Sequence, residues 1–293
     1  MNHFSIKDIE RMSGIKAHTL RIWEQRHGLR FCKRKASLHR YYDNEDLKQI
    51  LRIAYLYHNG YKISRIATLS PDEVKSLAIT SIGDNSYDIF INQMIEASID
   101  YDQPRFERVI HNALLHLGFE RTVVNVFYPF MEKIGLLWIT DHVIPAQEHF
   151  SSYLIQKRII IAIDGLDIIA KDNDQIVLIF SPEGELHEIP LLVMQYILRK
   201  HGIKTVYLGC NICLKELVYY CKHKPVTHLY FHLITNFIHK EPEEYLKCLQ
   251  ENLGSKNIIA SGPALRDVLV TGIRIIRSLE EMMEMNETLG LSS

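Results

Sequence analysis

Apolar residues follow two different periods along this chain, and the change of period divides it in two. Up to about residue 165, apolar positions recur every three or four residues, which is the spacing of helices with one buried face. From residue 174 onward, short apolar runs typical of buried strands alternate with helical segments. The pattern therefore predicts a helical N-terminal region followed by an α/β domain.

Two short helices separated by a glycine open the chain. The first is predicted to run from a Ser5 cap to a stop at Gly14, and the second covers residues 19–26. This is the helix-turn-helix pattern, whose second helix enters the DNA major groove. The residues expected to contact DNA are Lys16, His18, Thr19, Arg21, Arg26, Lys33, Arg34, Lys35, His39, Arg40 and Tyr41.

Positive charge supports DNA binding independently of the helix pattern. Residues 1–42 hold ten Lys or Arg and three Asp or Glu, although the whole chain has a formal net charge of −1. A protein that grips phosphates needs local cations, because each neutralised phosphate releases counterions. Trp23, in contrast, is expected to belong to the core of this small domain.

Helical spacing continues beyond the DNA-binding segment. Helices are predicted at 44–58, 62–68 and 70–79, and Ser-Ile-Gly-Asp-Asn-Ser at 81–86 is the best linker in the sequence. Four helices are then expected between residues 87 and 165, with breaks near 102–104, 118 and 141–145, enough for a four-helix bundle.

The C-terminal part alternates strands with helices. Strands are predicted at 175–180, 206–209, 227–233, 257–261 and 271–276, and helices at 187–201, 213–222, 240–253 and 278–288. This alternation predicts a Rossmann-like, doubly wound parallel sheet, in which ligands bind beyond the carboxyl ends of the strands. The fold class is thus multidomain, α followed by α/β.

Composition narrows the class of protein further. Hydrophobic residues make up 47 % of the 293 residues, no apolar run reaches the ~20 residues that a membrane helix needs, and the N-terminus lacks a signal peptide's apolar stretch. Five scattered cysteines suit reduced thiols in a cytoplasm. Cys210 and Cys213 form a C-x-x-C pair, but without a second pair no zinc or redox site is expected.

The opening segment resembles the winged helix-turn-helix of MerR-type bacterial transcription regulators. The resemblance is carried by Thr19-Leu20-Arg21-Ile22-Trp23-Glu24, Arg26, Gly28-Leu29, His39-Arg40-Tyr41-Tyr42 and Asp46-Leu47. The Trp23-Glu24 form looks like the subgroup that carries a cobalamin-binding sensor domain. The resemblance covers the first quarter of the chain and implies double-stranded operator DNA as a partner, with RNA polymerase reached indirectly.

A histidine loop follows the first strand of the α/β domain. Glu185, two residues before His187, can accept a hydrogen bond from the imidazole, which fixes the tautomer and raises the basicity of a metal ligand. The loop resembles the Asp-x-His-x-x-Gly signature of cobalamin-binding domains, with Glu185 for the Asp and Pro190 for the Gly. The resemblance implies that His187 binds cobalt in place of the cofactor's own lower base.

The helical region carries a second such signal. Trp138, followed after nine residues by Glu148-His149, looks like the motif in the helical cap of cobalamin-dependent MerR photoreceptors. The resemblance implies that these three residues lie over the upper face of the corrin. Because Pro145 must begin a new helix, Trp138 and Glu148-His149 are expected on successive helices that meet at one end.

Several positions depart from the family pattern. Its sheet domain usually offers Ser-x-Leu after the third strand and Gly-Gly after the fourth, lining a pocket for the nucleotide tail. Here His232 and Thr235 fall around the first, where His232 would narrow the pocket, and Ser261-Gly262 replaces the second. Pro190 stiffens the histidine loop. Ile139 stands where light-responsive members often carry a histidine that captures cobalt, so light sensing of that kind is less expected than cobalamin binding.

These observations predict a cytoplasmic, non-enzymatic transcription regulator with three domains, at 1–75, 87–165 and 172–290. It is expected to bind cobalamin, with adenosylcobalamin the favoured form, and to form a homodimer or homotetramer. One alternative is a degenerate regulator without cofactor, controlled by oligomerisation or a protein partner. Another class, the corrinoid carrier subunit of a methyltransferase, is disfavoured because such a carrier has no use for a DNA-reading domain.

Overall fold

The computed structural model describes residues 4–29, 33–34, 40–58, 60–80, 87–139, 145–166, 175–234, 242–265 and 268–283. The chain divides into two compact units, Met1–Leu154 and Ile155–Ser293, with the boundary inside a long helix. Within the described residues, no helix is both long and apolar enough to cross a membrane.

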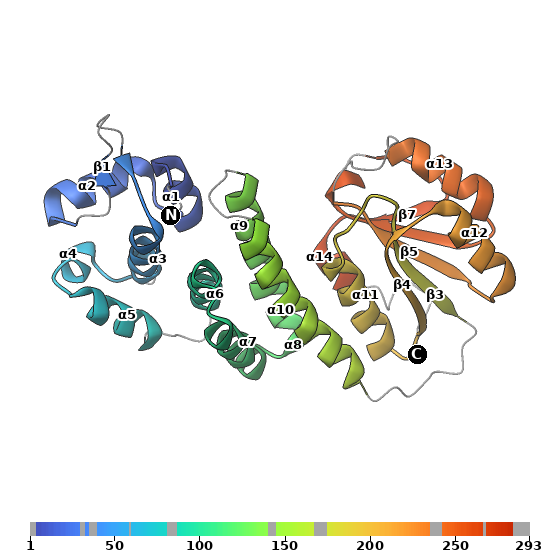
Figure 1. Cartoon of the computed structure of the whole chain (residues 1–293), viewed down its shortest axis with the longest axis horizontal. Coiled ribbons are helices and arrows are strands. Elements are labelled where there is room, and N and C mark those ends of the chain that lie inside the picture. Colours follow the sequence, from blue (N-terminus) through green and yellow to red (C-terminus); the bar gives the residue numbers. More distant parts are fainter. Residues whose placement is uncertain are drawn as a thin grey trace. The chain divides into compact units, whose positions relative to one another are not determined.

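The first part of unit 1, which we call the head (residues 4–80), is a small helical domain with a two-stranded hairpin (Figure 1). Its elements are α1 (Ile6–Ser13), α2 (Ala17–His27), β1 (Lys33–Arg34), β2 (Arg40–Tyr41), α3 (Asn44–His58), α4 (Ile63–Ile66) and α5 (Pro71–Thr80). Strands β1 and β2 pair antiparallel and form the wing. Gly28 ends α2 with φ +69°, a left-handed conformation that favours glycine. The predicted helices are confirmed.

The core of the head packs around Trp23. This side chain is 3 % exposed, and its ring lies edge-on to that of Tyr57, with centroids 4.8 Å apart. Leu20, one turn earlier on α2, is also buried. The prediction that Trp23 is a core residue rather than a DNA contact is therefore confirmed.

The rest of unit 1 is a set of helices that begins at residue 88. They are α6 (Asp88–Asp100), α7 (Gln103–Leu117), α8 (Phe119–Thr122), the π-helical segment η1 (Val123–Phe127), α9 (Tyr128–Ile139) and α10 (Pro145–Asp164), which continues into unit 2. Segments α8, η1 and α9 follow one another without a break, so four helical segments are present, as predicted. Asp102 caps α7 by accepting from the backbone N–H of Arg105. The predicted linker at 81–86 lies outside the described residues.

Unit 2 contains a five-stranded sheet. Its strands are β3 (Ile176–Pro182), β4 (Lys204–Ile212), β5 (His228–His232), β6 (Asn257–Ser261) and β7 (Ile273–Ile276), in the order β4-β3-β5-β6-β7. All neighbouring pairs are parallel, which confirms the predicted doubly wound sheet. The connecting helices are α11 (Ile189–Lys200), α12 (Leu214–His223), α13 (Pro242–Leu253) and α14 (Leu279–Met283).

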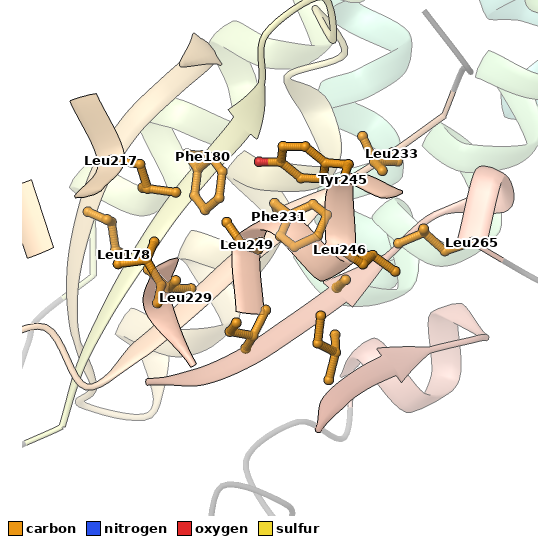
Figure 2. Close-up of a cluster of buried hydrophobic side chains, with 14 of the residues drawn as sticks. Leu178, Phe180, Leu217, Leu229, Phe231, Leu233, Tyr245, Leu246, Leu249 and Leu265 are labelled. Atoms are coloured by element: carbon orange, nitrogen blue, oxygen red, sulfur yellow. The ribbon is translucent and has the colours of Figure 1, made fainter. Parts of the chain in front are cut away.

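Alternate strand residues pack against helices on the two faces of the sheet. Figure 1 shows α12 and α13 on one face and α11 and α14 on the other. The α12–α13 face holds an apolar cluster that includes Phe180, Phe231, Leu217 and Leu246 (Figure 2). Because both faces are covered, the strands are apolar at almost every position, and polar side chains stand out at their carboxyl ends.

Candidate functional site

The loop between β3 and α11 lies at the carboxyl edge of the sheet. Gly184, with φ +90°, forms the turn after β3, and its N–H donates to Oδ1 of Asn211 at 2.9 Å. Helix α11 then begins at Ile189, with Pro190 in its first turn. Proline is well tolerated there, because the first-turn N–H groups have no partner inside the helix. Pro190, in the place of the family's glycine, thus helps to start α11.

Glu185 organises this loop. Although it is charged, the residue is only 1 % exposed, and its carboxylate accepts three hydrogen bonds. Oε1 accepts from Nδ1 and from the backbone N–H of His187, at 2.5 and 3.0 Å, and Oε2 accepts from the backbone N–H of Ile234 at 2.8 Å. Glu185 therefore ties the histidine loop to the segment that follows β5.

The hydrogen bond expected between Glu185 and His187 is thus present. It places the proton of the neutral imidazole on Nδ1 and the lone pair on Nε2. The His187 side chain is 48 % exposed, whereas the carboxylate beneath it is buried. A half-exposed imidazole held by a buried carboxylate is the arrangement that orients a histidine ligand toward a metal.

A second polar cluster lies next to this loop, at the ends of β5 and β6. Nδ1 of His232 lies 2.8 Å from Oγ of Ser261, and the hydroxyl of Tyr230 lies 2.7 Å from the same oxygen. The pKa of His232 is lowered to about 4, chiefly by burial. The Glu185 carboxylate partly opposes this shift and His187 adds to it, and the net result is a neutral imidazole at neutral pH. Sequence analysis missed Tyr230, although its spacing of two from His232 on one strand placed both on one face.

Gly262 lets the two strand ends approach closely. Its φ is +115°, and a Cβ at this position would lie 2.0 Å from the carbonyl oxygen of Leu233. No other residue fits there, because that oxygen belongs to the backbone. The structure thus explains why a glycine of the family pattern is kept at Gly262 while its neighbour is Ser261.

Cys210 lies near the same edge of the sheet, on β4. Burial, together with the nearby carboxylates of Glu188 and Glu185, raises the pKa of its thiol to about 11. The thiol is therefore protonated at neutral pH. A protonated thiol is a poor nucleophile and a poor metal ligand.

The predicted DNA contacts occupy α2 and the wing. Lys16, His18, Arg21 and Arg26 are exposed, and Thr19 is half-buried. Arg34 and Arg40 lie on the two wing strands, and Tyr41 is half-buried beside Arg40. Lys35 and His39 lie outside the described residues. The structure therefore brings the described members together on one helix and one hairpin.

Two of these cations are ion-paired within the head. Nζ of Lys16 lies 3.0 Å from Oε1 of Glu10, and that of Lys33 contacts the carboxylate of Asp43. Both lysines keep more than half of their side-chain surface exposed, at 80 % and 51 %. Sequence analysis had no signal for these pairs, since the number of charges along a segment does not reveal which carboxylates the fold places nearby.

The predicted cap residues fall on successive helices, as expected. Trp138 is the penultimate residue of α9, and its side chain is not among those the structure describes. Glu148 lies in the first turn of α10 and His149 directly follows it, and Oε2 of Glu148 is 3.0 Å from Nδ1 of His149. The His149 side chain is 76 % exposed and so is accessible on the surface of unit 1.

Comparisons with known proteins agree with this organisation. Residues 4–73 match the model of the MerR HTH family regulatory proteins, and residues 90–162 match a B12 binding domain. Two relatives from Myxococcus xanthus are HTH-type transcriptional repressors. CarH is 25 % identical to this chain over 213 residues, and CarA is 25 % identical over 218 residues. Both alignments span 70 % of this chain, and they span 70 % of CarH and 68 % of CarA.

A solved structure shares the fold of the sensor region. The monomethylamine corrinoid protein of Methanosarcina barkeri superposes with a TM-score of 0.58 at 15 % identity, and the match covers 70 % of this chain and all of that one. Together, the helix-turn-helix head and the B12 binding domain define the class: a DNA-binding transcriptional regulator that senses cobalamin. The chain thus carries a MerR-type helix-turn-helix domain and a B12 binding domain, and it is similar to CarH and CarA.

The side chains at the sheet edge fit a corrinoid's lower face. A corrinoid supplies its own equatorial nitrogens, so the protein has to provide only one axial donor. His187 is such a donor, because Glu185 orients its ring and the side chain is half-exposed. His232 and Ser261 occupy the neighbouring strand ends and lie within hydrogen-bonding distance of each other, so this side of the sheet edge is polar.

Proposed function

We propose that this protein represses transcription from an operator that it binds through the head, and that cobalamin bound by unit 2 controls this repression. The observation that carries the cofactor half is the buried Glu185 carboxylate holding the half-exposed His187 imidazole at the carboxyl edge of the sheet. The repressor sign rests on the names of the two relatives.

DNA recognition is assigned to α2 and the wing. The exposed side chains of His18, Arg21 and Arg26 lie on the second helix of the helix-turn-helix, the element that enters the major groove. Lys33, Arg34 and Arg40 lie on the hairpin and are assigned to the phosphate backbone. The proposed set of DNA contacts also includes Lys16, Thr19, Lys35, His39 and Tyr41.

Cofactor binding is assigned to His187 as the lower axial ligand, with Glu185 fixing its ring. The side toward the nucleotide tail is proposed to be lined by His232, Ser261 and Gly262. The upper face of the corrin is proposed to be covered by Trp138, Glu148 and His149. When bound, cobalamin supplies a cobalt ion whose upper ligand can be exchanged. We propose adenosylcobalamin as the bound form, because a tryptophan beside the upper position suits the bulky adenosyl group, whose adenine ring is flat and aromatic.

Control by the cofactor is assigned to assembly. Regulators that read paired half-sites bind weakly as single heads, so a dimer or tetramer is needed for tight operator binding. A ligand that binds only the assembled form stabilises it by mass action.

We propose domains at 1–75, 87–165 and 172–290, a role in the cytoplasm where the DNA lies, and regulation rather than catalysis.

The monomethylamine corrinoid protein of Methanosarcina barkeri shares its fold with 70 % of this chain, so a corrinoid carrier of a methyltransferase is the alternative class. The head favours the regulator, because residues 4–73 match a DNA-binding family and such a carrier does not require DNA. A regulator that has lost the cofactor is the remaining candidate, and the observation that favours it is the buried His232–Ser261 pair, which stands where the family pattern has smaller residues.

A visible absorption spectrum tests the cofactor assignment. Protein incubated with adenosylcobalamin and then desalted is expected to retain the chromophore, with the spectrum of a cobalt whose lower base is a histidine. The His187→Ala variant is expected to lose that spectral change and most of the affinity, since no other side chain of the loop supplies a nitrogen. If His187→Ala binds with unchanged spectrum and affinity, the cofactor-free regulator is the better account.

A further inference from the structure

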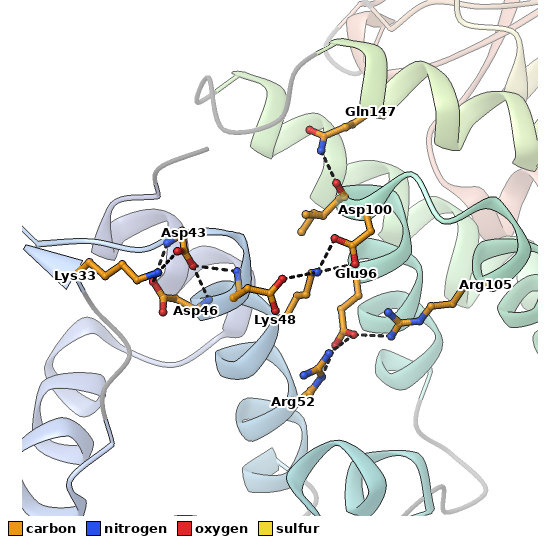
Figure 3. A network of polar contacts seen from close by, with 11 residues as sticks. Lys33, Asp43, Asp46, Lys48, Arg52, Glu96, Asp100, Arg105 and Gln147 are labelled. Atoms are coloured by element: carbon orange, nitrogen blue, oxygen red, sulfur yellow. Dashed lines mark hydrogen bonds and ion pairs between the residues drawn. The ribbon is translucent and has the colours of Figure 1, made fainter. Parts of the chain in front are cut away.

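The C-terminal end of α6 contacts two different parts of unit 1 (Figure 3). We call residues 96–100 of this helix the α6 junction. On one side the junction is ion-paired to α3 of the head, and on the other it is hydrogen-bonded to the first turns of α10. A short helical segment thus lies between the DNA-reading domain and the helix that carries Glu148 and His149.

The contact with the head is a pair of matched ion pairs. Nζ of Lys48 lies 2.6 Å from both carboxylate oxygens of Asp100, and Arg52 binds Glu96 in a bidentate fork at 2.9 and 2.6 Å. In each helix the two residues are four apart and lie on one face. The side chains of Lys48 and Glu96 are 5 % and 3 % exposed, whereas that of Asp100 is 43 % exposed, so each pair has one buried member and the Arg52–Glu96 pair is the more buried of the two.

Glu96 keeps a second cation on its own side of this contact. Nη2 of Arg105, from α7, lies 2.5 Å from Oε2 of Glu96, the oxygen that Nη2 of Arg52 also contacts. The buried carboxylate is therefore still paired when the head moves away, so separation does not leave it as an isolated buried charge. A polar contact of this kind resembles a transient interface between domains, in which relative motion is the ordinary expectation.

The contact with α10 is made by buried hydrogen bonds. Oγ of Ser98 lies 2.6 Å from Oγ of Ser151, and Nε2 of Gln147 donates to the carbonyl oxygen of Ile99 at 3.0 Å. Gln147 and Ser151 are 4 % and 0 % exposed. Gln147 directly precedes Glu148, so the turn that carries the proposed upper-face residues is fixed to the α6 junction.

We propose that the α6 junction couples the first turns of α10 to the head, and that the Arg52–Glu96 and Lys48–Asp100 pairs form a releasable lock on the DNA-reading domain. The lock itself is independent of any cofactor. Its response to cobalamin rests on the proposed function, because that response requires the ligand to contact the start of α10. A ligand that orders this turn holds the junction in place and keeps the lock closed.

Lys48 reports directly on whether the lock is closed. The full-length, cofactor-free protein is treated with a small excess of acetylating reagent, and mass spectrometry measures the acetylation rate at each lysine. The rate at Lys48 is expressed relative to that at Lys16, whose side chain is 80 % exposed. Arg52→Gln removes the fork while Arg105 still pairs with Glu96, and it is expected to raise the relative rate at Lys48 about tenfold. Glu45→Gln is the matched control, because it removes only the exposed, intrahelical partner of Lys48, and it is expected to leave the rate unchanged.

The Arg105→Gln variant distinguishes a releasable contact between the head and α6 from a permanently packed one. Without Arg105, Glu96 depends on Arg52 alone, so release of the head leaves a buried charge unpaired and becomes less favourable. The relative rate at Lys48 is therefore expected to fall or stay constant in this variant. Equal increases for Arg52→Gln and Arg105→Gln, or no increase for Arg52→Gln, overturn the lock. Circular dichroism verifies that each variant is folded.

The coupling is tested by adding adenosylcobalamin. In the wild type we expect about threefold protection of Lys48, and we expect this protection to disappear in a Gln147→Ala/Ser151→Ala double variant that still shows the cobalamin spectrum. Ser152→Ala is the control, because its hydroxyl is bonded only to its own helix, at His149. Bound cofactor without protection of Lys48 overturns the coupling. A missing cobalamin spectrum instead contradicts the proposed function and leaves the Arg52→Gln result to decide on the lock.

Discussion

The head exposes cations on α2 and at Lys33 of the hairpin, whereas Glu185, His232 and Ser261 are buried at the sheet edge. Arg21 and Arg26 are exposed, but Glu185 is buried and accepts three hydrogen bonds. Attraction to phosphates is long-ranged and is shared among many cations. Orientation of a metal ligand is short-ranged and depends on single bonds. A change at one residue should therefore cost little in the head and much at the sheet edge.

The largest expected effect comes from removing the head as a whole. Deletion of residues 1–75 is expected to abolish binding to duplex DNA in a gel-shift assay, because the cations cluster there. The truncated protein should still show the cobalamin spectrum, since Glu96 retains Arg105 as a partner and unit 2 is untouched. Normal DNA affinity after the deletion would place the DNA-binding surface elsewhere.

The buried polar cluster at the sheet edge predicts acid destabilisation. The pKa of His232 is about 4 in the fold, below its ordinary 6.5. As pH falls from 6.5 to 4, the unfolded chain takes up a proton that the folded chain does not, so stability falls, by up to about 3 kcal/mol. Urea unfolding of the apoprotein across this range measures the loss.

His232→Asn is the comparison variant for this pH dependence. It keeps a polar group beside Ser261 and removes the titrating ring, so the dependence should become shallower. It should not vanish, because burial also lowers the pKa of His228. An identical pH dependence in the variant and the wild type would contradict the assignment to His232.

Glu185→Gln sharpens the comparison at a single residue. The amide weakens the hydrogen bond that orients His187, and loss of such a supporting group costs roughly 10–100-fold in metal affinity. Titration with adenosylcobalamin, followed at the cobalt absorption bands, measures the change. Glu183→Gln, at an exposed position of the same loop, is the control and should bind normally. Equal affinities for the two variants would remove Glu185 from the site.

The smallest expected effect is that of one cation in the head. Arg21→Ala or Arg26→Ala should reduce the affinity for duplex DNA several-fold. If the arginine removed contacts a phosphate, the plot of log binding constant against log salt concentration should also have a slope shallower by about 0.9. Lys224→Ala, an exposed cation of unit 2, should change neither quantity. A hundredfold reduction for a single arginine would show that the head depends on individual side chains as strongly as the sheet edge does.

Local patterns in the sequence were sufficient for most of the fold. Ser5, Gly14 and Pro71 mark helix ends by backbone chemistry that acts within one turn, and the structure places helix boundaries beside each of them. The five strands were recognisable because a parallel sheet with both faces covered needs continuous apolar runs. The order of the strands across the sheet could not be predicted in this way, because it depends on how the separate strand–helix units pack.

Two features can be recognised in the amino-acid sequence alone: a basic helix-turn-helix, and a histidine two residues after a carboxylate at the end of a buried strand. Both are local, because neighbouring residues in one element make them. Folding adds three sets of contacts that the sequence does not reveal: Glu185 accepts from Ile234, Tyr230 joins His232 at Ser261, and Arg52 and Arg105 share Glu96. These contacts join residues from 9 to 49 positions apart, and such pairs become neighbours only when separate elements pack.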